Sequence, residues 1–274
     1  LLHAGLCIHD DLIDGDDRRN GRPNVLGAVR AHRLAEGAPA AVADRQASAA
    51  AVLAGDLAIG AGLRALLRAP FEPGLRSVLA LELLDALDET IAGEVLDVRG
   101  ETLAPHDARP VRTAELKTAS YSVILPLRLG ALASGRSAPG ALAALTEYGR
   151  HLGVAYQLKD DELAVFGDPG VTGKSASSDI RGGTRTRLLQ LALASATPAE
   201  RVVLERDVGR ADLPDAGVDR VRAIMRDCGA LEEHRALIAR HAAEAVAALA
   251  SSALPDELVG YLRVIARAVP GRAR

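Results

Sequence analysis

Five aspartates lie within eight residues near the start of the chain, in the stretch CIHDDLIDGDDRRNGRPNV, residues 7–25. Asp10, Asp11 and Asp14 come at the end of an apolar run, at positions i, i+1 and i+4. On a helix, Asp10 and Asp14 share one face about 5–6 Å apart, where two like charges repel and call for a cation. A hard divalent ion such as Mg²⁺ takes oxygen ligands and keeps positions open for substrate phosphates. A solvated helix end with capping aspartates is the alternative.

A second pair of adjacent aspartates, Asp160 and Asp161, occurs in YQLKDDELAVFGDP, again at the end of a helix that is apolar on its other side. Two such clusters, far apart in sequence, can face each other across a helical bundle and hold metal ions between them. Paired carboxylate sites with bridging Mg²⁺ suit diphosphate substrates, because the ions neutralise charge that develops on the leaving group. The second cluster therefore favours a metal site over two unrelated helix ends.

Of the 33 Lys and Arg residues, only Lys117, Lys159 and Lys174 are lysines. Lys117 lies in the apolar segment AELKTASYSVILPL. A buried ammonium is costly unless it is paired, so we expect Lys117 to point at an anion; a chance surface position is the alternative. Lys174 lies in the polar stretch GDPGVTGKSASSDIRGGTRT, where a solvated lysine is the default. This stretch is not a P-loop, because five residues rather than four separate Gly167 from Gly173 and no strand precedes it.

The elements that position these residues are predicted to be helices almost throughout. Ala, Leu and Arg favour helices, and 49% of the 274 residues are hydrophobic but only 2% aromatic. Apolar spacings of three and four residues, without convincing β alternation, predict one all-α bundle with short loops. Pro126 predicts a kink, and 15–24 and 167–186 are predicted loops. The long helices are predicted at residues 44–69, 75–101, 111–135 and 142–167, after a first helix that ends at the aspartates, and four shorter helices run to Val269.

Charge and cysteine content exclude several classes of protein. The net charge of −3 gives no global field that attracts nucleic acid. Cys7 and Cys228 are too few for a disulfide framework, which fits a reducing compartment. No signal peptide is visible, and no apolar run is expected to reach the roughly 18 residues of a membrane span. These features predict a soluble, cytoplasmic protein. Because the chain starts at Leu1 inside an apolar pattern, we expect it to be cut at the front.

Seven motifs in the expected order resemble those of the trans-isoprenyl diphosphate synthases, or polyprenyl synthetases. The resemblance extends from residue 1 to about residue 190 and continues beyond only in helical character. It implies a single all-helical domain over residues 1–274 that lacks its N-terminal helices. The implied fold is an isoprenoid synthase bundle of about ten or more helices around a central apolar cavity, usually as a homodimer. The motifs are DDLID, GRPNV, LAGDLAIG, IAGEVLDV, ELKTASY, YQLKDD and the loop GDPGVTGKSASSDIRGGTRT.

The resemblance implies a Mg²⁺-dependent condensation of an allylic diphosphate with isopentenyl diphosphate, in which the allylic diphosphate ionises and isopentenyl diphosphate attacks the carbocation. About three Mg²⁺ ions per site are implied. The implied site residues fall into four groups. The implied Mg²⁺ ligands are Asp10, Asp14 and Asp160, with Asp11 and Asp161 in the same catalytic motifs. The residues implied to bind the allylic diphosphate are Arg19, Lys117, Thr118, Gln157 and Lys174, and His3 is implied to bind isopentenyl diphosphate. The residues implied to set product length are Gly5, Leu6 and Leu2.

The resemblance further implies that the residue five positions before the first motif, which is Gly5, sets the product length. An aromatic side chain there would stop chain growth early, whereas glycine leaves room. We therefore expect a product of about C20, geranylgeranyl diphosphate, and a shorter product when Gly5 is replaced by Phe.

Departures from the motifs affect mainly the isopentenyl diphosphate half of the site. An early Gly-Gly-Lys-Arg segment is absent from the chain, and Asn20 replaces the second of two arginines, with Arg18 as a substitute if the loop shifts. The second motif ends in Ala164 instead of aspartate. Thr184 replaces a common lysine, for which Arg185 can compensate. Loss of a phosphate-binding cation removes charge-assisted hydrogen bonds of about 1.5–3 kcal/mol each, so the chain is expected to be less active.

Two other functions remain open on the sequence alone. A class I terpene cyclase shares the helical fold and the first aspartate motif and needs no isopentenyl diphosphate site. A catalytically weak subunit of a heteromeric prenyl synthase also suits the departures. The remaining histidines, His151, His234 and His241, are expected at the surface or at helix caps rather than as ligands.

Overall fold

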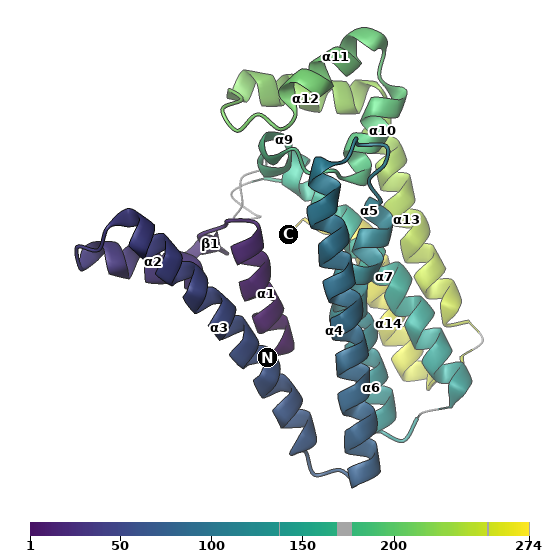
Figure 1. Ribbon diagram of the computed structural model, residues 1–274. Helices are drawn as coiled ribbons and strands as arrows, with labels where there is room; N and C mark the ends of the chain where they lie inside the picture. Colours follow the sequence, from purple (N-terminus) through teal and green to yellow (C-terminus); the bar gives the residue numbers. More distant parts are fainter. Residues whose placement is uncertain (137, 169–176, 251, 274) are drawn as a thin grey trace. The chain divides into compact units, whose positions relative to one another are not determined.

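The structure is a computed structural model that describes residues 1–136, 138–168, 177–250 and 252–273 (Figure 1). Helices account for most of these residues, which confirms the predicted all-α class. The chain forms two compact units, Leu1–Leu81 and Glu82–Arg274, and each is described by itself.

The first unit contains three helices, a short hairpin and the start of a fourth helix. α1 and α2 both pack on α3, and α1 lies beside α3 in Figure 1. The helix α2 and the hairpin were not predicted from the sequence, although the predicted loop at 15–24 contains the hairpin. The bounds are α1 Leu2–Ile13, β1 Arg18–Arg19, β2 Arg22–Pro23, α2 Val25–Ala35, α3 Ala40–Leu67 and α4 Pro73–Thr102.

Small residues bring the backbones of α1 and α3 close together. The buried face of α3 consists of Ala43, Ala47, Ala51 and Gly55, each four residues from the next and therefore on one side of the helix. Opposite them lies Gly5 of α1, where a Cβ atom would come within 2.7 Å of Cγ1 of Ile59 and 2.8 Å of the Gly55 carbonyl oxygen. The contact between α1 and α3 therefore requires glycine at position 5.

The hairpin after α1 is closed by a two-residue turn at Asn20 and Gly21. Both residues have positive φ, 52° and 73°, as the type I′ turn of a tight hairpin requires, and Asn-Gly is its preferred sequence. The turn pairs Arg19 with Arg22 across the two strands. It therefore explains why asparagine stands at position 20, where the related motif has an arginine.

The second unit starts within α4 and contains every later helix. After residue 186 the structure has five α-helices and a final 3₁₀ turn among the described residues, instead of the four predicted helices. A short helix, α9, also lies inside the predicted loop 167–186. The bounds are α5 Pro110–Thr113, the π-helix η1 Ala114–Ile124, α6 Leu125–Ala133, α7 Pro139–Phe166, α9 Ser178–Gly182, α10 Arg187–Ser195, α11 Pro198–Asp207, α12 Asp215–Asp227, α13 Ala230–Ala248, α14 Asp256–Ala268 and η2 Val269–Gly271.

The predicted helix 111–135 is continuous but changes type along its length. Its central eleven residues form a π-helix, a rare conformation often found at functional sites. The π-helix ends at Ile124, so Pro126 falls in the first turn of α6, where its missing N–H is tolerated. The structure thus has a change of helix type at the position of the kink predicted from Pro126.

Glycines on two neighbouring helices allow η1 to pack closely between them. A Cβ on Gly93 of α4 would collide with the backbone nitrogen of Lys117, and one on Gly153 of α7 would collide with Ala119. Gly149, one turn before Gly153, lies against Ile124 in the same way. These contacts fix the backbone of η1, which carries Lys117 and Thr118.

The core of the second unit lies around α7, which packs against both η1 and α13. Tyr148 of α7 is fully buried, and its hydroxyl donates a hydrogen bond of 2.8 Å to the carbonyl oxygen of Leu262 in α14. A second cluster of buried apolar side chains joins α10, α11 and α12. α7 is therefore a rigid, buried support for the aspartates near its C-terminal end.

One helix differs from the expectation that no segment has the length and apolar character to cross a membrane. α3 has both, with a mean hydropathy of 1.6 over an 18-residue window of which 17% is buried. Its exposed apolar side chains include Val52, Leu53 and Leu57. This is weak evidence, because an alanine-rich helix that packs against other protein helices passes the same test.

Candidate functional site

A cavity of about 110 Å³ lies in the second unit, between α4, η1, α7 and the segment that precedes α10. Four of the residues singled out in the sequence line it, namely Lys117, Thr118, Gln157 and Asp161. Thus ELKTASY and YQLKDD, which are about 40 residues apart in sequence, contribute side chains to one cavity. The other polar or charged residues that line it are Asp97, Arg109, Thr113, Thr184, Arg185 and Thr186.

Lys117 is only 21% exposed and is paired with two carboxylates of α4. Its Nζ lies 2.9 Å from Oε2 of Glu94 and 2.7 Å from Oδ2 of Asp97. This agrees with the expectation that a lysine in an apolar helix points at anions. Both acids belong to the motif IAGEVLDV, but sequence analysis assigned them no role. Gly93, which precedes Glu94, permits the close approach of α4 and η1 that makes this pairing possible.

Thr118, Gln157 and Asp161 form a chain of hydrogen bonds along the cavity wall. The Thr118 hydroxyl donates to Oε1 of Gln157 at 2.7 Å, and Nε2 of Gln157 donates to Oδ1 of Asp161 at 3.0 Å. Because Gln157 and Asp161 are four residues apart on α7, they share one face of the helix. The amide of Gln157 thereby orients a carboxylate at the cavity.

The carboxyl group of Asp161 is surrounded by other carboxylates. Burial raises its pKa well above the ordinary value, and the negative charges of Asp179, Asp160 and Asp97 raise it further, although the hydrogen bond from Gln157 acts in the opposite direction. An environment that disfavours negative charge to this extent would be relieved by a bound cation. These four aspartates offer only oxygen atoms, the ligands that Mg²⁺ prefers. In chemical type, these donors therefore suit magnesium.

Asp160 is paired with an arginine close to the C-terminus. Nη1 of Arg272 donates a hydrogen bond of 2.6 Å to Oδ1 of Asp160. The guanidinium carbon of Arg272 lies 3.8 Å from the centre of the Tyr156 ring, one turn earlier on α7, which is the geometry of a cation–π contact. Sequence analysis gave no role to Arg272, because no motif connects it with residues 112 positions earlier.

Thr184 and Arg185 line the cavity beside Lys117, in the loop where the related motif commonly has a lysine. Arg185 donates through Nε to the carbonyl oxygen of Leu103 at 3.3 Å, which anchors its side chain at this wall. Arg109 supplies another positive charge that the sequence did not single out. Arg185 is thus placed as the predicted compensation for Thr184 requires. Lys174 lies outside the described residues.

In the first unit, Arg19 of the hairpin bridges the first two aspartates of the DDLID motif. Its Nε and Nη2 lie 2.8 and 2.7 Å from Oδ1 of Asp11, and Nη2 lies 2.8 Å from Oδ2 of Asp10. Although burial alone would lower it, the pKa of Arg19 is raised by its hydrogen bond to Asp11 and the nearby acidic charges. Arg19 therefore supplies part of the positive charge that the clustered aspartates require.

Asp10 and Asp14 behave as their spacing predicts. They place carboxylate oxygens within 4.8 Å of each other, close enough to share one cation. Asp11 is 4% exposed and is held by Arg19, the same side chain that contacts Asp10. His3 lies two turns earlier on α1, where its ring nitrogens are 3.6 and 3.7 Å from Sγ of Cys7.

The packing corrects the expectation that glycine at position 5 leaves room for a growing product. A side chain at position 5 would point at Gly55 and Ile59 of α3 rather than into open space. The absence of a side chain thus serves the contact between two helices. Leu2 and Leu6, four residues apart and both partly exposed, remain predicted determinants of product length.

The alternative in which Arg18 replaces the missing second arginine finds no support in the hairpin geometry. Nη2 of Arg18 donates to the carbonyl oxygen of Gly21 at 2.5 Å, across the turn. The register that pairs Arg19 with Arg22 also excludes a shift of one residue within this hairpin, because a shift would move the Asn-Gly pair out of the turn.

Comparison with known proteins gives the same family over most of the chain. The family described as Polyprenyl synthetase matches residues 1–226. The (2E,6E)-farnesyl diphosphate synthase of Mycobacterium tuberculosis (strain H37Rv) is 29% identical over 276 residues, which cover 99% of this chain and 71% of that protein. The farnesyl pyrophosphate synthase of Schizosaccharomyces pombe is 37% identical over 111 residues, 40% of this chain and 31% of that protein.

A solved structure shows the same fold. The geranylgeranyl pyrophosphate synthase from Corynebacterium glutamicum, complexed with isoprenyl diphosphate and magnesium, matches with a TM-score of 0.89 and 33% identity, over 99% of this chain and 76% of that chain. The chain therefore spans most, but not all, of the length of these two bacterial proteins, and less than a third of the yeast protein. From the family match, the fold and the cavity built by its motifs, we conclude that the chain belongs to the polyprenyl synthetase family of prenyltransferases.

Proposed function

We propose that this chain is a Mg²⁺-dependent prenyltransferase that condenses an allylic diphosphate with isopentenyl diphosphate. The observation that carries the proposal is the cavity of the second unit, where Lys117, Thr118, Gln157 and Asp161 converge. A lysine, a hydroxyl group and an amide are suitable partners for a diphosphate, and the adjacent carboxylates are suitable ligands for its counterions. The product length proposed is about C20, within the range that the names of the relatives span.

The cationic side chains act on the leaving group of the allylic substrate. Ionisation leaves most of the new negative charge on diphosphate, so Lys117 and Arg185 stabilise the transition state more than the ground state. In this proposal Lys117 exchanges its present partners, Glu94 and Asp97, for phosphate oxygens. Thr118 and Gln157 fix the orientation of the diphosphate through hydrogen bonds.

Magnesium is proposed as the counterion at both aspartate motifs. Asp10 and Asp14 are the proposed ligands in the first unit, and Asp160, with Asp161 beside it, in the second; about three ions per site are expected. When bound, the ions would neutralise charge on the diphosphate and so favour its departure. Arg272, whose guanidinium is bound to Oδ1 of Asp160, would oppose the binding of magnesium by this carboxylate.

The isopentenyl diphosphate half of the site is proposed to be weak. His3 is the residue proposed to contact this substrate, and Asn20 takes the place of an arginine that would contribute a charge. The left-handed backbone at position 20 favours asparagine, so the turn geometry disfavours an arginine there. We therefore expect binding of the allylic substrate to be retained better than binding of isopentenyl diphosphate.

A cytoplasmic homodimer is the proposed form of the protein, acting as a single synthase domain. Leu53 and Leu57 of α3 are 63% and 69% exposed, and Ile91 and Val95 of α4 are also exposed. A second copy of the chain would bury such apolar helix faces, which soluble proteins rarely leave in contact with water. Sedimentation of the purified chain tests this form, and a monomer at micromolar concentration would contradict it.

Product analysis with radiolabelled allylic diphosphate, with and without isopentenyl diphosphate, tests the proposed reaction. Elongated diphosphates that form only with both substrates and Mg²⁺ support it. Release of hydrocarbon from the allylic substrate alone would instead indicate a terpene cyclase. If no product forms, calorimetry with the allylic substrate and Mg²⁺ decides between the remaining possibilities: binding that Lys117→Ala weakens supports a catalytically weak subunit, and no binding overturns the proposed site.

A further inference from the structure

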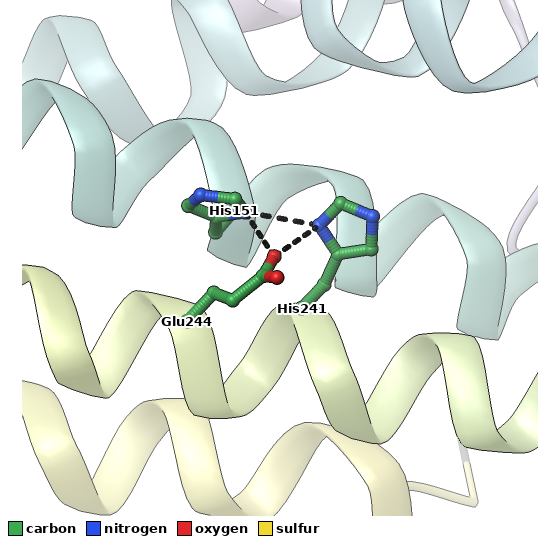
Figure 2. Close-up of side chains that lie close together, drawn as sticks. All are labelled: His151, His241 and Glu244. Carbon is green, nitrogen blue, oxygen red and sulfur yellow. Dashed lines mark hydrogen bonds and ion pairs between the residues drawn. The ribbon is translucent and has the colours of Figure 1, made fainter.

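Two histidines and a glutamate converge at the contact between α7 and α13, outside the cavity described above. His151 projects from α7, and His241 and Glu244 project from one face of α13, three residues apart (Figure 2). The prediction that His151, His234 and His241 are surface or capping residues is wrong. The side chains of His151 and His241 are only 14% and 11% exposed, and His234 is fully buried elsewhere in the same unit.

Three potential ligand atoms form a small triangle at this point. Nδ1 of His151 lies 3.0 Å from Nδ1 of His241 and 3.0 Å from Oε2 of Glu244, and Nδ1 of His241 lies 3.7 Å from the same oxygen. Figure 2 shows the three groups directed toward one another. A single ion about 2.0–2.1 Å from all three atoms would lie roughly 0.8 Å above the plane of the triangle. The geometry thus accepts a small ion without a rearrangement of the backbone.

The type of ligand selects the class of metal. Two imidazole nitrogens and one carboxylate oxygen are typical ligands of Zn²⁺ and related transition metals, whereas Mg²⁺ prefers oxygen atoms alone. Burial lowers the pKa of His151 and of His241, so both rings are kept in the neutral form that binds metals. Glu244 is 45% exposed and leaves the cluster open to solvent, from which an ion and a fourth ligand, water, can enter.

A metal ion on Nδ1 of His151 must displace the proton of the ring, and the hydrogen bonds of His151 indicate where this proton lies. Nη2 of Arg150 donates to Nε2 of His151 at 2.8 Å, so the ring proton is on Nδ1, where Oε2 of Glu244 and Nδ1 of His241 are both acceptors at 3.0 Å. With a metal on Nδ1 this proton moves to Nε2, and Arg150 turns away. Oε2 of Glu147, 3.9 Å from Nε2, is then placed to accept it, as carboxylates do beside metal-binding histidines.

We propose that His151, His241 and Glu244 form a transition-metal site, of which Zn²⁺ is the preferred occupant, that cross-links α7 to α13. Glu147 is its outer hydrogen-bond partner. This site is separate from the Mg²⁺ site at the aspartate motifs and does not depend on the proposed prenyltransferase activity. Because α7 and α13 form the core of the second unit, the bound ion increases the stability of this unit.

Spectroscopic titration with Co²⁺ in excess Mg²⁺ tests the site, since Mg²⁺ occupies the aspartate motifs but does not compete for imidazole. One equivalent of Co²⁺ is expected to give the visible absorption of a low-coordinate ion, and Zn²⁺ is expected to displace it. Glu244→Gln, which keeps the shape of an exposed side chain, and His241→Ala should each abolish this absorption. Glu147→Gln should weaken binding by roughly 10-fold, whereas His106→Ala, which removes an exposed histidine elsewhere, should change nothing.

Thermal unfolding gives a second readout that is independent of spectroscopy. Zn²⁺ should raise the melting temperature of the wild-type protein and of His106→Ala but not of Glu244→Gln, and melting in chelator shows whether each variant is folded. The proposal is overturned if the wild-type protein binds no Co²⁺ in excess Mg²⁺, or if folded Glu244→Gln and His241→Ala bind it as tightly as the wild type does.

Discussion

Arg272, in the last described residues of the chain, is ion-paired with Asp160 at 2.6 Å and covers the ring of Tyr156 at the same time. The segment that follows α14 thus returns to the second aspartate motif. The positive charge of Arg272, held at Oδ1 of Asp160, opposes the binding of a cation by the same carboxylate.

Replacement of Arg272 by alanine is expected to lower the Mg²⁺ concentration needed for half-maximal substrate binding or turnover. The pair is partly exposed and therefore contributes up to about 1 kcal/mol, which corresponds to a change of about fivefold. A Mg²⁺ titration of each variant measures the effect. Arg267→Ala, an exposed arginine of α14, is the control; an equal response of both variants would show that Arg272 does not compete with the metal.

Gly93→Ala is expected to destabilise the protein by about 1–3 kcal/mol, because the new Cβ collides with the backbone of Lys117. For a unit of this size, each kcal/mol lowers the melting temperature by about 2–4 °C. Gly100→Ala, on the same helix but with nothing within 4 Å, is the matched control and should be neutral or slightly stabilising. Melting curves compare the two. Equal melting temperatures would contradict the close packing of α4 on η1.

Asp161→Asn is expected to stabilise the metal-free protein at neutral pH. The folded protein retains the Asp161 proton to a higher pH than the unfolded chain does, since the pKa of Asp161 is raised. The stability of the wild-type protein should therefore fall as pH rises from the ordinary pKa of about 3.9 toward the raised value. The stability of Asp161→Asn should not show this decrease with rising pH.

Melting temperatures from pH 3 to pH 8 in chelator test this expectation. Asp88→Asn, an exposed position on α4, is the control for general charge effects. Mg²⁺ should reduce the difference between the wild type and Asp161→Asn, because a cation relieves the same repulsion. If the stability of the wild type and that of Asp161→Asn change with pH in the same way, the fold does not raise the pKa of Asp161.

Gly5→Phe is no longer a suitable test of product length, since the ring would push α1 away from α3. It should unfold the first unit or lower its stability severely. Leu6→Phe is the better variant, and we expect it to shorten the product by one or more isoprene units while the protein remains folded. Chromatography of dephosphorylated products measures the lengths, with Leu34→Phe, a partly exposed position of α2, as the control. An unchanged product distribution would remove Leu6 from the proposed determinants.

The sequence predicted neighbouring side chains correctly where both residues lie on the same helix. Asp10 with Asp14, and Gln157 with Asp161, are four residues apart, so their shared faces follow from helix geometry alone. Lys117 was correctly expected to face anions, but the identity of those anions depends on how closely η1 approaches α4. That distance is set by Gly93, and no local pattern reveals which helix a glycine faces.

Other features could not be predicted because they depend on distant segments or on local turn chemistry. The pairing of Arg272 with Asp160 joins residues 112 positions apart. Five helices follow residue 186 instead of the four predicted. The connections between them are short, as at Thr197, whose capping box with Glu200 starts α11 directly after α10. The burial of His151 and His241 follows from the packing of α7 on α13, which periodicity does not specify.

The Asn20–Gly21 turn restricts which residues position 20 can hold. A left-handed backbone at residue 20 tolerates asparagine but penalises arginine by about 1 kcal/mol. An arginine at this position would therefore strain the hairpin unless the loop were longer. Natural variation at this position should therefore be accompanied by changes in loop length, which engineers of this scaffold can use as a guide.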